Sequence, residues 1–155
     1  MATKLKNLLI VHHSRSGTVH RMAEAVIAGA SICENIHLET LNPLHASIKA
    51  VKKADAIIIG TPENFGYMSG AVKFFFEEIY YECLDSSRGL PYALFVAAGN
   101  DGNGAVSSIE RIIKGLGWKA VAEPIISRDG ITENTLENCR ELGMSLSEGL
   151  ELGLY

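Results

Sequence analysis

An apolar run and a polar turn follow one another in Leu8-Leu9-Ile10-Val11-His12-His13-Ser14-Arg15-Ser16-Gly17-Thr18. The apolar run is short and unbroken, which is typical of a strand buried on both faces of a sheet. After the turn, apolar residues recur every three or four positions from Val19 to Ala30, so they line one face of a helix. The segment therefore predicts a strand, a turn and a helix in succession.

The turn at 14–18 is suited to bind a phosphate group. Backbone N–H groups at a helix N-terminus lack intrahelical partners and carry partial positive charge. Ser14, Ser16 and Thr18 add hydroxyl donors, and Gly17 permits a close approach of the backbone to an anion. The alternative is that the hydroxyls only cap the helix. Neither the ATP-binding pattern with its lysine nor Gly-x-Gly-x-x-Gly follows the strand, so ATP and a Rossmann-bound dinucleotide are not expected.

Composition favours one cytoplasmic globular domain over residues 1–155. Hydrophobic residues make up 47% and charged residues 21%, and no apolar stretch approaches the roughly 20 residues of a membrane span. We therefore expect neither a membrane partner nor a signal peptide. A net charge of -4 gives no basic footprint for nucleic acid. The three cysteines and five histidines show no metal-ligand spacing, so we expect no metal and three reduced, packed thiols.

Strands and helices alternate to the end of the sequence in five strand–helix units. The further strands are expected at 36–41, 56–59, 91–98 and 119–126, and the further helices at 47–53, 69–83, 105–116 and 132–152. Gly117 is expected to end the helix before it. This alternation predicts an α/β fold in which helices cover both faces of a parallel sheet.

Ligands of such sheets bind beyond the carboxyl ends of the strands, where two further loops are notable. Residues 61–70 carry Phe65 and Met68, either of which could pack on a flat apolar ring while backbone amides meet its polar edge. The alternative is that Phe65 packs in the core. Residues 99–104 are rich in glycine and short polar side chains, and they could also be only a turn. Together with residues 14–18, these loops predict a site for a planar cofactor that carries a phosphate.

A longer motif supports this prediction. Ile57-Ile58-Ile59-Gly60-Thr61-Pro62 is followed by Phe65-Gly66-x-Met68-Ser69-Gly70 and by a helix with Lys73 and Phe74 to Phe76. This pattern resembles the flavodoxin-like flavoproteins, whose cofactor is FMN, and within them the tryptophan-repressor-binding-protein branch of NAD(P)H-dependent quinone oxidoreductases. The resemblance covers nearly the whole chain. It implies a doubly wound sheet of five parallel strands in the order 2-1-3-4-5.

The resemblance also implies the residues of an FMN site. The phosphate would be held by Ser14, Arg15, Ser16, Gly17, Thr18 and Val19. The ring would be lined by Pro62, Glu63, Asn64, Phe65 and Gly66, and its other edge would meet Gly99, Asn100, Asp101 and Gly102. No side chain is expected to act as a catalytic acid, base or nucleophile, because the chemistry belongs to the flavin.

The chain also departs from that branch. Glu63-Asn64 replaces its usual Thr-Arg, which changes the charge near the ring and any contact with a pyridine nucleotide. The resembled enzymes also carry an added segment that helps to build a tetramer, and this chain has none, so a tetramer is not expected and a homodimer is left open.

Two functions fit an FMN site in this chain. The first is an oxidoreductase that uses NADH or NADPH to reduce a quinone or a flavin. The second is a flavodoxin-type electron carrier that serves a redox protein. Residues 99–104 contain no aromatic side chain to cover the ring, and the net charge is only modestly acidic, so the oxidoreductase is favoured.

Overall fold

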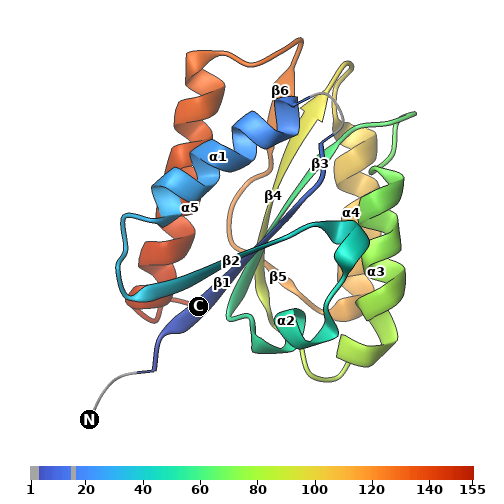
Figure 1. Cartoon of the computed structure of the whole chain (residues 1–155). Helices are drawn as coiled ribbons and strands as arrows, with labels where there is room; N and C mark the ends of the chain where they lie inside the picture. The colour runs from blue at the N-terminus through green and yellow to red at the C-terminus, as the bar shows by residue number, and fades with distance from the viewer. Residues whose placement is uncertain (1–3, 15–16) are drawn as a thin grey trace.

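The computed structural model describes residues 4–14 and 17–155, in which strands and helices alternate (Figure 1). The strands are β1 (Lys6–His12), β2 (Ile36–Leu41), β3 (Ala56–Pro62), β4 (Pro91–Ala98), β5 (Lys119–Ala120) and β6 (Ile125–Arg128). The helices are α1 (Thr18–Ala30), α2 (Ile48–Lys53), α3 (Gly70–Cys83), α4 (Asn103–Leu116) and α5 (Glu133–Glu151), with a 3-10 turn, η1, at Pro43–His45.

All strand pairs are parallel, and the sheet runs β2-β1-β3-β4-β5, with β6 also paired to β4. The predicted strand order is therefore confirmed. The central strands are the unbroken apolar runs of the sequence. Ile10 pairs with Ile58 and Ile59 pairs with Leu94, and all four side chains are buried. This burial on both faces explains why these strands lack the alternation of a half-exposed strand.

The sheet divides the core into two halves. Successive residues of a strand point to opposite faces, so Leu8 and Ile10 pack with α1 and α5. Leu9 and Val11 pack instead with residues of α2, α3 and α4. In Figure 1, α1 and α5 accordingly lie on one side of the sheet, and α3 and α4 lie on the other.

The prediction of one strand over 119–126 is wrong, because the chain forms β5 and β6 with a break between them. Both pieces pair with β4, but residues 121–124 stand opposite only Ala93 and Leu94. Two extra residues cannot stay in a regular ladder, and Pro124 has no N–H to donate to it. The break moves β6 to the carboxyl end of β4, where the predicted loops also lie.

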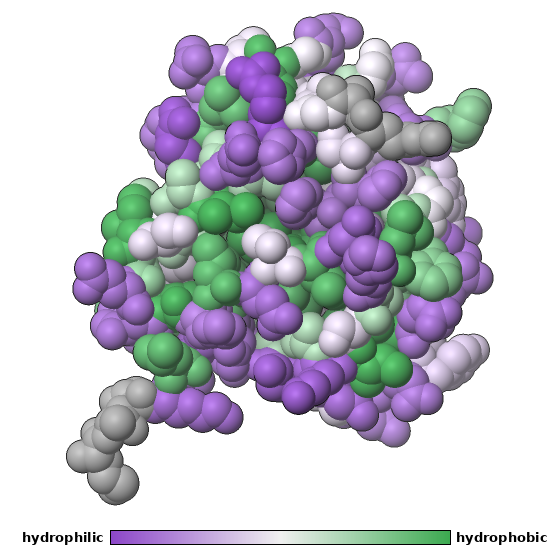
Figure 2. All heavy atoms as spheres, in the orientation of Figure 1, coloured by the Kyte–Doolittle hydropathy of each residue, from purple (hydrophilic) through white to green (hydrophobic). Residues whose placement is uncertain are grey.

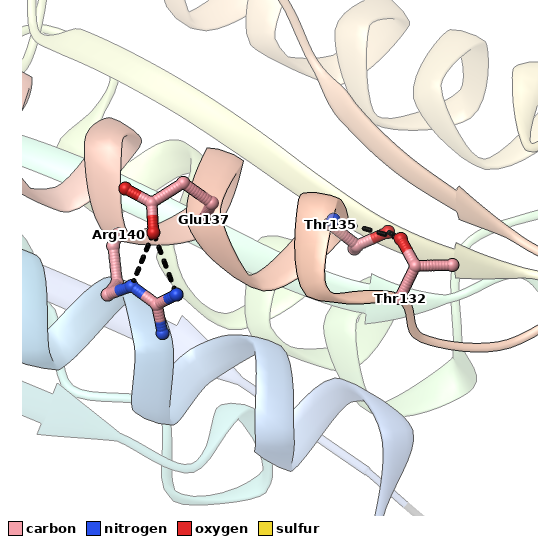
Figure 3. A network of polar contacts seen from close by, with 4 residues as sticks. All are labelled: Thr132, Thr135, Glu137 and Arg140. Carbon is pink, nitrogen blue, oxygen red and sulfur yellow. Dashed lines mark hydrogen bonds and ion pairs between the residues drawn. The ribbon is translucent and has the colours of Figure 1, made fainter.

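Side-chain caps fix several helix ends. Thr132 accepts a hydrogen bond from the Thr135 N–H at 3.1 Å and begins α5, and further along Arg140 pairs with Glu137 at 2.8 Å (Figure 3). Gly117 adopts a left-handed conformation with φ of 72° and ends α4, as predicted.

The surface mixes residue types, and Figure 2 shows hydrophobic side chains interspersed with hydrophilic ones on the face that carries β2. Within the described ranges, none of the helices has the length and apolar character needed to cross a membrane.

Candidate cofactor site

The polar turn after β1 leads into α1 through Gly17. Gly17 takes a left-handed conformation with φ of 89°, and its N–H donates to the Ser14 hydroxyl at 2.8 Å. This bond uses the oxygen of Ser14 as an acceptor and leaves its O–H as a donor for a ligand. No side chain of the described residues caps the start of α1, and a Cβ at Gly17 would meet no atom within 4 Å. The first N–H groups of α1 therefore have no side-chain cap among the described residues, as an anion site requires.

The other predicted residues of this turn differ in their placement. Thr18 is partly exposed and faces the hollow described below. The Val19 side chain is buried in the core, so only its backbone is available to a ligand. Arg15 and Ser16 lie outside the described residues.

The second loop is a tight hairpin. The backbones of Asn64 and Tyr67 exchange two hydrogen bonds, at 2.9 and 3.0 Å, and Phe65 and Gly66 form the tip with φ of 54° and 67°. Positive φ at both central residues is typical of a type I′ turn, in which a bulky residue at the first position is strained. Phe65 is fully exposed, so the interpretation that it packs in the core is wrong. Met68 is buried and does not line the site.

The third loop is held against β6. The Asp101 carboxylate accepts from the Asn103 N–H at 2.9 Å, and the Asp101 carbonyl accepts from Nε of Arg128 at 3.1 Å. Gly102 has φ of 77°, and a Cβ there would lie 2.5 Å from Ile126. Glycine is therefore needed for packing at position 102.

The second and third loops also contact each other. The Glu63 carboxylate accepts from the Ala105 N–H at 3.3 Å, and the Met68 N–H donates to the Ser108 hydroxyl at 3.1 Å. A Cβ at Gly104 would lie 1.9 Å from the Gly66 carbonyl oxygen, so only glycine permits this approach. Glu63 thus places its negative charge at the N-terminus of α4, where the helix dipole stabilises it.

The loops enclose a hollow of about 280 Å³ at the carboxyl ends of β3, β4 and β6. Five of its lining residues were predicted from sequence: Thr18, Pro62, Glu63, Asn64 and Gly99. Phe65, Gly66, Asn100, Asp101 and Gly102 are not among the lining residues and belong to the hairpin and loop beside it.

Sequence reasoning missed a fourth loop, which contributes Ser127 and Gly130 to the hollow. The Ser127 hydroxyl donates to the Gly130 carbonyl at 2.7 Å, and Asp129 and Gly130 both have positive φ. Asp-Gly after an apolar run is a turn signal, so this loop could have been found at the end of the last strand.

The donor set suits a ligand with an anionic end and a planar end. The N-terminus of α1, which no described side chain caps, and the Ser14 hydroxyl before it are suited to a phosphate. Pro62 and Ala98 supply apolar surface to the hollow, and Asn64 and Ser127 supply polar groups. Within residues 4–14 and 17–155, no cluster of His, Cys, Asp or Glu could hold a metal ion.

Comparisons with known proteins agree with this geometry. Residues 12–130, which contain all four loops, match the family described as NADPH-dependent FMN reductase. Over 91% of the chain, the sequence is 25% identical to a flavodoxin of Aquifex aeolicus, and the match covers 85% of that protein. Over 54% of the chain, it is 36% identical to an NAD(P)H dehydrogenase (quinone) of Geobacter sulfurreducens. The match spans about half the length of that enzyme, 49%.

Solved structures show the same fold. A flavodoxin from the domain Archaea has a TM-score of 0.78 at 23% identity, with 94% of this chain and 99% of that chain covered. A WrbA-like flavodoxin from Agrobacterium tumefaciens has a TM-score of 0.76 at 22% identity, with 95% and 98% covered. The doubly wound architecture is therefore that of the flavodoxins.

Proposed function

This chain belongs to the NADPH-dependent FMN reductase family, and we propose from this that it binds FMN at the four loops and uses NAD(P)H to reduce a quinone or a flavin. The quinone as acceptor is supported by the 36% identity to the Geobacter enzyme over half of the chain. We also propose a cytoplasmic location, because Cys33, Cys83 and Cys139 are free thiols of the kind that stay reduced there.

The residues of the chain would bind and orient the cofactor. Ser14, Gly17 and Thr18, with Arg15 and Ser16 of the same turn, would hold the phosphate through hydroxyl and backbone donors. Pro62, Asn64 and Gly99 would line the ring, and Ser127 would meet its polar edge. When bound, FMN would supply the chemistry of hydride transfer between NAD(P)H and the acceptor.

One observation favours an enzyme over a carrier. Among the aromatic side chains of the four loops, only Phe65 and Tyr67 of the hairpin are exposed, and residues 99–104 contain none. One face of a bound ring would therefore stay open to a second planar molecule, which hydride transfer from a nicotinamide requires.

Anaerobic stopped-flow mixing tests this function. The FMN-loaded protein is mixed with NADPH or NADH, and flavin absorbance is followed. Rapid bleaching by either nucleotide supports the reductase. Bleaching by dithionite but by neither nucleotide would contradict it, and it would favour an electron carrier, the function suggested by similarity to the Aquifex flavodoxin over most of the chain.

FMN titration tests the site itself. Thr18→Ala should weaken FMN binding by about 1–3 kcal/mol, since it removes a hydroxyl beside the phosphate. Ser107→Ala is the matched control, because Ser107 is an exposed residue of α4 outside the lining of the hollow. Equal affinities of the two variants would contradict the role of Thr18.

A further inference from the structure

A second hollow lies at the same edge of the sheet, beside the ends of different strands. It has a volume of about 480 Å³ and lies at the carboxyl ends of β1 and β2, whereas the first lies at the ends of β3, β4 and β6. Ser14 and Gly17 line the second hollow, and Thr18 lines the first. The described residues of the turn that is proposed to hold the flavin phosphate therefore border both hollows.

Three histidines line this second hollow: His12, His13 and His20. The rings of His12 and His20 lie 6.1 Å apart between centroids. The Nδ1 atoms of His12 and His13 are buried, and neither has a hydrogen-bond partner among the described residues. Unpaired buried nitrogens are rare in folded proteins and call for a functional explanation.

The remaining lining supplies donors and no carboxylate. Thr40 lines the hollow and carries a hydroxyl donor, whereas Ser14 and Gly17, which border it, are the residues proposed to hold the flavin phosphate. Asn42 also lines it, and the Oδ1 of this residue already accepts from the Leu44 N–H at 2.9 Å, so the NH₂ group is left as a donor.

Glu24 pairs with His20 at 3.1 Å but does not line the hollow. The described residues form no cluster suited to a metal ion. The histidine imidazoles, the Thr40 hydroxyl and the Asn42 amide together form a donor set for an oxyanion.

We propose that this hollow binds a second phosphate group, that of a nucleotide, beside the flavin phosphate. The proposal rests on the proposed function, since the flavin phosphate is assigned to the turn that borders both hollows. Two nucleotides related to the proposed function could supply this group. FAD would continue from its flavin phosphate into its second phosphate, and NADPH would bring its 2′-phosphate.

Histidine-resolved NMR tests the site directly. FMN-loaded protein is titrated with inorganic phosphate at constant ionic strength. The flavin phosphate then already occupies the polar turn at 14–18. The ring signals of His12, His13 and His20 should shift saturably, and those of His37, an exposed residue of β2, should not. No saturable shift, or equal shifts at His37, would overturn the proposal.

Two variants locate the phosphate. His13→Ala should weaken phosphate binding about tenfold, which corresponds to the 1.4 kcal/mol of one hydrogen bond. Asn42→Asp keeps the acceptor for Leu44 and adds a negative charge at the hollow, so it should weaken binding even if His13→Ala does not fold. His37→Ala is the control.

The same titration on the apoprotein separates this proposal from the proposed function. If FMN fails to bind, the proposed function fails, yet the histidine signals still report on phosphate. Binding that is lost in Thr18→Ala but kept in His13→Ala would place the phosphate in the turn and overturn the second site.

Nucleotide preferences then distinguish the two sources. A preference for FAD over FMN that His13→Ala abolishes identifies the flavin dinucleotide. A preference for NADPH over NADH in KM that the same variant abolishes identifies the nicotinamide nucleotide. If His13→Ala changes neither preference, the assignment to a nucleotide is overturned.

Discussion

Phe65 combines a strained backbone with an exposed ring at the edge of the proposed flavin site. A left-handed conformation costs a non-glycine residue about 1–2 kcal/mol, and asparagine tolerates it best. Phe65→Asn should therefore raise the free energy of unfolding of the apoprotein by about 0.5–1 kcal/mol, as measured by urea denaturation. The same change should weaken FMN binding by about 0.5–1.5 kcal/mol, because an aromatic contact is lost.

The two effects of this substitution have separate controls. Tyr81→Ala removes an exposed aromatic ring from α3, so it should leave FMN affinity unchanged. A destabilised Phe65→Asn apoprotein would show that the ring packs on the fold. Unchanged FMN affinity would show that Phe65 does not contact the cofactor.

His12 gives the fold a defined acid sensitivity. Burial lowers the pKa of His12 from its usual value of 6.5, and the nearby His20 and His13 lower it further. Because the folded pKa is below the unfolded one, the unfolded chain takes up the proton first as the pH falls. Neutral, buried His12 therefore makes its full contribution to stability above pH 6.5. This contribution is lost as the pH falls through the pKa of His12 in the folded protein.

Urea denaturation between pH 7 and pH 5 measures this contribution. As the pH is lowered from 7 to 5, the free energy of unfolding should decrease less in His12→Gln than in the unmodified chain. His37→Gln, which changes an exposed histidine of β2, should follow the unmodified chain. Parallel slopes for all three proteins would contradict the assignment to His12.

Helices α1 and α5 contact each other through glycines, which makes their interface sensitive to a single methyl group. A Cβ at Gly143 would lie 1.9 Å from the Val26 carbonyl oxygen, and one at Gly29 would lie 1.9 Å from the Arg140 carbonyl oxygen. Backbone atoms cannot move away as a flexible side chain could. The close approach also allows the buried Ser147 hydroxyl to donate to the Ala30 carbonyl at 2.8 Å.

Gly143→Ala should therefore lower the free energy of unfolding by about 1–3 kcal/mol, despite the higher helix propensity of alanine. Gly70→Ala is the matched control, because a Cβ at this helical glycine meets no atom within 4 Å. The free energy of unfolding of the Gly70→Ala protein should be unchanged or slightly raised. Chemical denaturation of both variants checks the difference. Equal stabilities would mean that α1 and α5 separate without cost.

The elements show which features a sequence can predict. The runs that became β1, β3 and β4 were readable because burial on both faces demands unbroken apolar residues. The break between β5 and β6 was not readable, because it depends on the length of β4 opposite residues 121–124. The glycine contacts of α1 and α5 need both helices in place, so helical spacing alone could not indicate them.

The same distinction holds for the site. The polar turn and the hairpin could be placed at one sheet edge, because parallel strands bring their carboxyl ends together. The direction of the Phe65 side chain depends on the type of turn. The sequence alone supported an exposed ring and a ring packed in the core equally well. The cap that Glu63 provides to α4 depends on the packing between loops, which no local pattern contains.

At the scale of the whole molecule, the two larger hydrophobic clusters of the described residues lie on opposite faces of one sheet. Trp118 packs with Phe76 on one face, and the Trp118 indole donates to the Ser87 hydroxyl at 2.8 Å. Cys139 lies in the core of the other face, where burial raises the pKa of its thiol to about 11. A thiol that is both buried and neutral reacts with a reagent only after that face opens.

If residues 1–155 form one domain, both faces should unfold together. Trp118 fluorescence and mass-resolved labelling of Cys139, measured at pH 8 over a denaturant series, should give the same midpoint. FMN at about 100 times its Kd should raise the free energy of unfolding by about 2.7 kcal/mol, because it binds only the folded chain. The increase should be the same whether Trp118 or Cys139 reports it. A Cys139 midpoint below that of Trp118 would mean that α1 and α5 unfold separately from the sheet. Because these helices carry the N-terminus that is proposed to bind the phosphate, FMN would then raise the Cys139 midpoint more than that of Trp118.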